Sequence, residues 1–152
     1  MEFIGPVLTE SESITMIERA RKSWNEHGYG RFVVEISQDS EPIGFVGLAQ
    51  CKFKSHFTPA VEIGWRLTQK AWGFGYATEG ANAVINWAFQ SLELTEIVSF
   101  TSSLNYRSTS VMEKIGMQRN PTDDFQHPNL TIGDPLRANV LYRRNKEYGE
   151  VD

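Results

Sequence analysis

Residues 61–92 switch from strand periodicity to helix periodicity across a short turn, and this switch limits the possible folds most strongly. Apolar and polar residues alternate over residues 61–68, as in a strand with one buried face. Over residues 77–92 the apolar positions recur at helical spacing. Gly73 and Gly75 lie between the two patterns. The sequence therefore predicts a strand, a tight turn and a helix in direct succession.

A glycine turn at the start of a helix is a common anion site. The first backbone N–H groups of the helix have no partner inside it, and the helix dipole favours negative charge there. Glycine lets a phosphate approach the backbone because no side chain stands in the way. Thr78 occupies the place of the third glycine in the dinucleotide fingerprint, and the Gly-Lys-Ser/Thr of a nucleoside-triphosphate loop is missing. Taken alone, the turn is equally compatible with a tight bend that binds nothing.

The other periodic segments predict a mixed sheet with helices packed on it. Thr9 and Glu12 form the pattern of a capping box, and Gly28 ends the helix that they begin. Strands are expected at residues 32–36, 43–52, 96–101 and 139–144, and a short helix at residues 107–115. With 152 residues and no linker, we expect one α+β (mixed α/β) domain over residues 1–152.

Composition narrows the classes of function. The formal net charge is −4, which does not suggest a nucleic-acid-binding surface. No apolar run is long enough to cross a bilayer, and the N-terminus lacks the pattern of a secretory signal. Cys51 is the only cysteine, so an internal disulfide and two-cysteine metal or redox motifs are excluded. We therefore expect a cytoplasmic protein without a metal, nucleic acid or membrane partner.

Two longer blocks resemble the GNAT acetyltransferases. They read "EIGWRLTQKAWGFGYATEGANAVINWAF" and "EIVSFTSSLNYRSTSVMEKIGM". The second block, together with Phe125, His127-Pro128 and the closing "VLYRR", is similar to the ribosomal-protein N-acetyltransferase (RimJ/RimL-like) branch. The resemblance runs from about Gly5 to Arg144 and implies the GNAT acyl-CoA N-acyltransferase fold, a mostly antiparallel sheet flanked by helices.

The resemblance implies that acetyl-CoA is the co-substrate and that the glycine turn holds its pyrophosphate. Lys70 stands where the family motif more often has arginine or glutamine, and it offers positive charge without a planar fork. Backbone groups of residues 65–67 are expected to pair with the pantetheine amides as an added strand does. The expected cofactor contacts are Trp65, Arg66, Leu67, Lys70, Trp72, Gly73, Phe74, Gly75, Tyr76, Ala77, Asn105 and Ser108.

The resemblance also implies direct attack of an amine on the thioester, with no metal and no covalent enzyme intermediate. Glu62 is the predicted general base, although a strand carboxylate can simply face solvent. Ser108 is the predicted proton donor to the departing thiolate, and Tyr106 is the alternative donor. Asn105 and Ser108 also suit the cap and first turn of a helix without any further role. His127 is a weaker candidate for the acceptor pocket.

The chain departs from the family pattern at its beginning and near its end. Family members usually have a strand and a helix before the segment at Gly5-Pro6, and Glu2 to Ile4 are too few residues to replace a strand. The strand at residues 32–37 is therefore expected to have an open edge. We expect either a homodimer through this edge or a gene start placed too late. Asn139 stands where the family often has histidine.

These observations predict an N-acetyltransferase that moves an acetyl group from acetyl-CoA to a primary amine. The acceptor is expected to be a protein N-terminus or a small molecule. The alternative is a non-catalytic module that binds acyl-CoA but has a degraded acceptor site. A third reading is a domain that binds a phosphate ligand of another kind.

Overall fold

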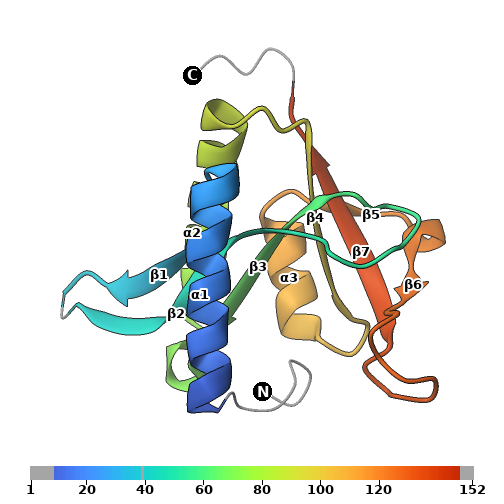
Figure 1. Ribbon diagram of the computed structural model, residues 1–152, viewed down its shortest axis with the longest axis horizontal. Coiled ribbons are helices and arrows are strands. Elements are labelled where there is room, and N and C mark those ends of the chain that lie inside the picture. Colours follow the sequence, from blue (N-terminus) through green and yellow to red (C-terminus); the bar gives the residue numbers. More distant parts are fainter. Residues whose placement is uncertain (1–8, 39, 148–152) are drawn as a thin grey trace.

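The computed structural model describes residues 9–38 and 40–147 and is built around one mixed sheet (Figure 1). The strand order is β1-β2-β3-β4-β7-β5, and β6 also pairs with β7. Strands β3 and β4 run parallel, whereas the other paired strands run antiparallel. The strands are β1 (Arg31–Ile36), β2 (Glu41–Gln50), β3 (Val61–Leu67), β4 (Glu96–Ser102), β5 (Gln118–Arg119), β6 (Phe125–Gln126) and β7 (Ala138–Asn145).

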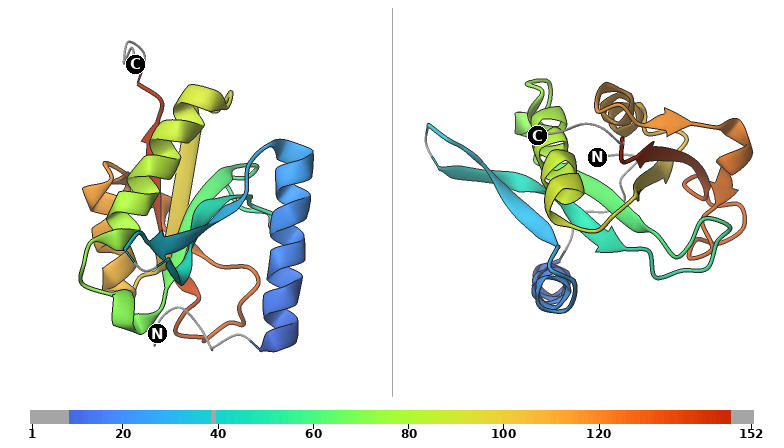
Figure 2. Two further views of the ribbon diagram at one scale, coloured as in Figure 1. Left: turned by 90° about the vertical axis from the view of Figure 1, so that its left-hand side faces the viewer. Right: turned by 90° about the horizontal axis from the view of Figure 1, so that it is seen from above.

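Helices lie on both sides of this sheet. Helix α1 (Glu10–His27) lies on one side, and helices α2 (Tyr76–Ser91) and α3 (Tyr106–Lys114) lie on the other, as both views in Figure 2 show. Two short 3-10 turns, η1 (Gln69–Ala71) and η2 (Pro121–Asp123), complete the order. The described chain therefore forms a mostly antiparallel sheet flanked by helices, as its sequence predicts.

The main core lies between the sheet and helix α2. Ala81, Val84, Ile85 and Ala88 are buried along one stripe of α2, at the helical spacing that the sequence shows. They pack against alternating residues of the strands, among them Ile63 of β3, which is 2% exposed. A second cluster packs Tyr76 and Ala77 in the first turn of α2 against Leu67 at the end of β3, and this contact positions the glycine turn between them.

Strands β3 and β4 are paired at one point and then diverge. Their parallel pairing is recorded at Glu62 and Val98. One residue further on, the Ser99 hydroxyl donates a hydrogen bond to the Ile63 carbonyl at 2.9 Å, so a side chain replaces the next backbone bond. Beyond this point, residues 65–67 face open space on the β4 side and line a pocket. The edge of β3 at residues 65–67, where an extended ligand is expected to pair, is therefore accessible.

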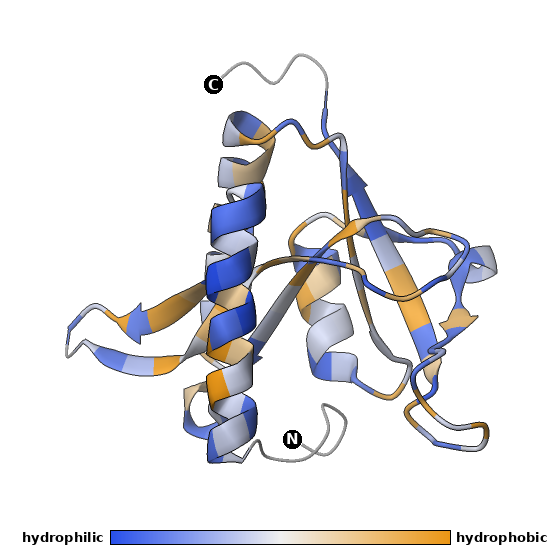
Figure 3. Cartoon of the chain, in the orientation of Figure 1, coloured by the Kyte–Doolittle hydropathy of each residue, from blue (hydrophilic) through white to orange (hydrophobic). Residues whose placement is uncertain are grey.

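Helix α1 is held mainly by its C-terminal end. The Thr9 hydroxyl caps its start by accepting from the Glu12 backbone N–H at 3.2 Å, and Gly28 ends it with φ 76°. The Trp24 ring packs edge-on against Phe32 at 4.9 Å. Ile14 and Ile17 lie at helical spacing but are not buried: they are 50% and 51% exposed, and Figure 3 shows α1 as mostly hydrophilic. Within the described residues, no element covers that part of the helix.

Strand β1 is the first strand of the sheet, so one of its edges has no neighbour in the described chain. Phe32 and Val33 of this strand are 36% and 69% exposed. The expected self-association through this edge stays a prediction. The expectations for Glu2 to Ile4 and for Gly5-Pro6 concern positions outside the described residues.

The main differences from the predicted elements are small strands and shifted ends. Strands β5 and β6 have two residues each, too few to show an alternating pattern, and both exist because β7 lies beside them. Strand β2 begins at Glu41 instead of residue 43, and α3 begins at Tyr106 instead of residue 107. In the part of the chain that the structure describes, no helix has both the length and the apolar character that crossing a bilayer requires.

Candidate active site

The glycine turn presents unobstructed backbone at the start of α2. Gly73 and Gly75 have φ angles of 87° and 78°, in the left-handed region that glycine adopts without strain. A Cβ atom added at either residue would meet no atom of the described chain within 4 Å, so the space above both is open. Gly75 is the residue that precedes α2, and no side chain caps the first N–H groups of this helix. The turn can therefore receive an anion at these donors.

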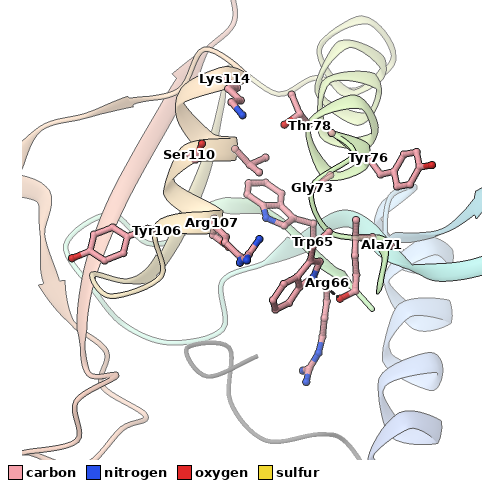
Figure 4. Close-up of a pocket in the computed structure, with 16 residues that line it drawn as sticks. Trp65, Arg66, Ala71, Gly73, Tyr76, Thr78, Tyr106, Arg107, Ser110 and Lys114 are labelled. Atoms are coloured by element: carbon pink, nitrogen blue, oxygen red, sulfur yellow. Dashed lines mark hydrogen bonds between the residues drawn. The ribbon is translucent and has the colours of Figure 1, made fainter. Parts of the chain in front are cut away.

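The turn opens into a pocket of about 420 Å³ between α2, α3 and the free edge of β3 (Figure 4). The wall on the α3 side includes Arg107, Ser110 and Lys114, whereas Gly73 and Thr78 lie on the α2 side. The lining residues are Trp65, Arg66, Leu67, Ala71, Trp72, Gly73, Gly75, Tyr76, Ala77, Thr78, Tyr106, Arg107, Ser108, Ser110, Val111 and Lys114. Backbone donors and two cations of α3 thus face one space.

Trp72 and Arg107 join the two sides of the pocket. The Trp72 indole N–H donates to the Leu67 carbonyl at 3.1 Å, which fixes the ring against the end of β3. The Arg107 guanidinium lies over this ring, with its Cζ 4.4 Å from the ring centroid. A cation held in this way contributes positive charge beside the glycine turn, and the contact with the ring holds the side chain in place.

The start of α3 brings a buried hydroxyl to the pocket. The Asn105 side chain accepts from the Ser108 backbone N–H at 3.2 Å and donates to the Thr101 hydroxyl at 3.1 Å, so it caps the helix and ties it to β4. Ser108 is 9% exposed and lines the pocket. Tyr106 is 74% exposed, and its ring points away from the middle of the pocket in Figure 4.

Glu62 lies on the face of β3 that points away from α2, and it does not line this pocket. Burial raises the pKa of its carboxyl to about 7, although attraction to Arg31 and the contact with the Cys51 thiol act in the opposite direction. The Cys51 thiol donates towards the Glu62 carboxylate over 3.9 Å, and burial together with Glu62 raises the pKa of the thiol to about 12. A carboxyl that titrates near neutral pH can exchange protons in either direction, whereas this thiol stays protonated.

Most of the expected cofactor contacts converge on the pocket, but three do not line it. Lys70 forms an ion pair with Glu41. Phe74 is 68% exposed and stacks on Tyr76 at 5.5 Å. Asn105 is buried behind the start of α3, where it acts as the helix cap. The roles assigned to these residues, and to those that line the pocket, stay predictions.

The sequence reasoning missed the face of α3 that lines the pocket. Ser110 and Val111 lie three and four residues after Arg107, and Lys114 lies three residues after Val111, which is the spacing that puts side chains on one face of a helix. Arg107 and Lys114 begin and end this series, and two cations on one helix face indicate from the sequence that the face meets negative charge. Ala71 and Thr78 also line the pocket and carry no comparable pattern.

Comparisons with known proteins agree on one family. The family model for the acetyltransferase (GNAT) domain matches residues 1–118. FsC-acetyl coenzyme A-N(2)-transacetylase of Aspergillus fumigatus is 41% identical over 64 residues, 42% of this chain and 27% of that enzyme. The uncharacterised protein YkkB of Bacillus subtilis is 30% identical over 100 residues, 64% of this chain and 57% of YkkB. This chain therefore spans less than two thirds of the length of both relatives.

A solved structure matches over a larger part of the chain. The acetyltransferase from Agrobacterium tumefaciens superposes with a TM-score of 0.73 at 27% identity. The match covers 95% of this chain and 77% of that one.

Proposed function

Because the chain belongs to the GNAT acetyltransferase family, we propose that it transfers an acetyl group from acetyl-CoA to a primary amine. The observation that carries this proposal is the glycine turn, whose open donors face the pocket between α2, α3 and the free edge of β3. The name of the Aspergillus relative specifies acetyl coenzyme A, which supports the same choice of acetyl donor.

The residues present fit a phosphate-bearing thioester. The backbone N–H groups at the start of α2 would hold the pyrophosphate, with Arg107 and Lys114 adding positive charge from across the pocket. The free edge of β3 at residues 65–67 would pair with the extended arm. Acetyl-CoA bound there would supply an activated acetyl group, and the chain's own residues would manage the protons.

We assign the general base to Glu62 and the general acid to Ser108. The amine arrives as an ammonium and must lose a proton before it can attack, and a carboxylate with a pKa of about 7 is matched to that step near neutral pH. The departing thiolate needs a proton, and the Ser108 hydroxyl at the pocket wall can donate one. The exposure of Tyr106 and the direction of its ring favour Ser108 over that alternative.

Within the family, we propose that the chain belongs to the RimJ/RimL-like branch, because the sequence of residues 105–117 resembles that branch. The Asn105 cap and the Ser108 hydroxyl in this block have distinct positions, one behind the pocket and one at its wall. Acceptors proposed on this basis are a peptide N-terminus or a small-molecule amine.

Two measurements separate this function from its alternatives. Calorimetric titration with acetyl-CoA should show saturable binding, whereas inorganic phosphate alone should bind weakly, because it reaches the glycine turn but not the edge of β3. Thiol release should then appear with at least one amine in a panel of peptides, amino acids and polyamines. Tight acetyl-CoA binding without thiol release for any amine would identify a non-catalytic module. Failure to bind acetyl-CoA would reject both readings.

A further inference from the structure

Arg31 is a partly buried cation on the same sheet face as Glu62. Cross-strand pairing places Arg31 beside Gly47, and Gly47 beside Gly64 of β3, so these residues form one row across the sheet. Glu62 lies two residues from Gly64 and therefore points to the same face. Gly47, which lies between Arg31 and β3, has no side chain on this face of the sheet.

The Arg31 guanidinium is held in place but not neutralised by a close partner. Its Cζ lies 4.7 Å from the centroid of the Phe45 ring. Within residues 9–38 and 40–147 it forms no hydrogen bond and no salt bridge, and its attraction to Glu62 acts over a longer distance. Burial lowers the pKa of this guanidinium, but the group remains charged at any pH at which the protein would work. Five donors in a rigid fork are thus available for an anion.

The sheet surface is open at Gly64, two residues from Glu62 along β3. Gly64 is exposed although β3 is an interior strand, and among the described residues a Cβ atom added there would meet nothing within 4 Å. The opposite face of the same strand is covered by α2. The Gly64 position is therefore a depression in the middle of the sheet, bordered by Glu62 along the strand and by Arg31 across it.

We propose that this depression binds the acceptor as an amine that also carries a carboxylate, with Arg31 binding the carboxylate and Glu62 facing the amine. The inference rests on the proposed acetyltransferase function and names its substrate class as amino-acid-like compounds. A guanidinium fork matches the two oxygens of a carboxylate. A phosphate fits the fork equally well but brings up to two negative charges close to Glu62, so the single charge of a carboxylate suits this face better.

The test compares acceptors that differ only at the carboxyl group. L-leucine, L-leucinamide and 3-methylbutylamine share one side chain, and 4-aminobutyrate and its amide extend the distance between amine and carboxyl. Thiol release gives kcat and KM for each acceptor, and calorimetry on protein saturated with CoA gives affinities without turnover. We expect at least one acid to exceed its amide in both measurements by about tenfold or more.

Variants of Arg31 then show whether this residue binds the carboxylate of the acceptor or only interacts with Glu62. Arg31→Gln should raise KM for the preferred acid by about 10- to 100-fold and change KM for the neutral amines by less than about twofold. Arg31→Lys keeps the charge but loses the fork, so its KM for the preferred acid should lie between those of the parent and Arg31→Gln. Arg119→Gln, at the opposite edge of the sheet, is the matched control and should behave as the parent. Thermal melts verify that each variant is folded.

Two results would overturn the inference while leaving the proposed function intact. One is equal use of acids and their amides by the parent. The other is an Arg31→Gln variant that loses activity equally with all acceptors, which would make Arg31 only a partner of Glu62. If no amine releases thiol, the proposed function fails, and the calorimetric comparison of L-leucine with L-leucinamide still decides whether the depression recognises a carboxylate.

Discussion

The two faces of strand β3 differ in what covers them and in what they can bind. On one face, Ile63 and Leu67 are buried, and beyond them the strand edge and the glycine turn offer mainly backbone donors to the pocket. On the other face, Glu62, Gly64 and Arg66 are only partly covered or exposed, and side-chain charge dominates.

The difference separates a general binding function from a selective one. A site built from backbone groups depends on chain geometry, so it tolerates many side-chain changes and suits a co-substrate shared by a whole family. A site built from side chains changes with single substitutions, so it suits an acceptor that differs among relatives. Changes on the Glu62 face should therefore alter turnover and acceptor choice, and changes at the glycine turn should alter co-substrate affinity.

The largest effect is expected from Glu62→Gln. Loss of the proposed general base should lower kcat by roughly 10²–10⁴-fold while leaving acetyl-CoA affinity unchanged. In the parent, activity should rise with pH through about 7, because the carboxyl must be ionised to accept a proton. The variant should lose this rise. Glu35→Gln, an exposed carboxylate of β1, serves as the control, and a parent-like pH–rate profile in Glu62→Gln would assign the base to another group.

A large effect on the other face is expected from Gly75→Glu. The new side chain adds bulk and negative charge where the pyrophosphate is proposed to bind, and the residue must keep a positive φ. Acetyl-CoA affinity should fall by about 10²-fold or more, since each hydrogen bond to a charged group contributes about 1.5–3 kcal/mol. Calorimetry measures the affinity.

Gly133→Glu provides the matched control for this change. Gly133 also has a positive φ, 91°, with open space around it, and it does not line the pocket. Equal affinities in the two folded variants would show that the glycine turn does not hold the phosphates.

A smaller effect is expected at the start of α3. Ser108→Ala should lower kcat by about tenfold, which is less than the usual 10²–10⁴-fold of acid–base catalysis because water can partly replace the hydroxyl. Tyr106→Phe should have little effect because its ring points away from the pocket. The two variants are compared in thiol-release assays with the same acceptor. The reverse order of effects would identify Tyr106 as the donor.

The smallest effect concerns stability. The pKa of Glu62 is raised from 4.5 to about 7 in the folded state, so the folded protein binds the proton more tightly than the unfolded chain does. This contribution to stability is full below about pH 4.5 and is lost as pH rises through about 7.

Glu62→Gln cannot ionise. The free energy of unfolding of this variant, relative to that of the parent, should therefore rise by on the order of 2 kcal/mol when the pH is raised from 5 to 8. Urea unfolding at both pH values measures this difference. A difference that is the same at both pH values would mean that Glu62 titrates normally.

Much of the fold was readable from spacing along the chain. The alternation over residues 61–68 and the helical spacing after Gly75 predicted β3, the turn and α2, because each depends on the geometry of consecutive residues. The N-caps at Thr9 and Asn105 were readable for the same reason, since each cap bonds to an N–H group three residues away. The short strands β5 and β6 were not, because each depends on pairing with the distant strand β7.

The candidate site divides in the same way. The glycine turn is a local feature, so the sequence was enough to place it at the start of a helix. That Arg107 faces it from α3, and that Arg31 shares a sheet face with Glu62, depends on how the strands are ordered and paired. The exposure of Ile14 likewise follows from which elements reach α1. Pairing and packing join residues far apart in the chain, and no local pattern encodes the distances between them.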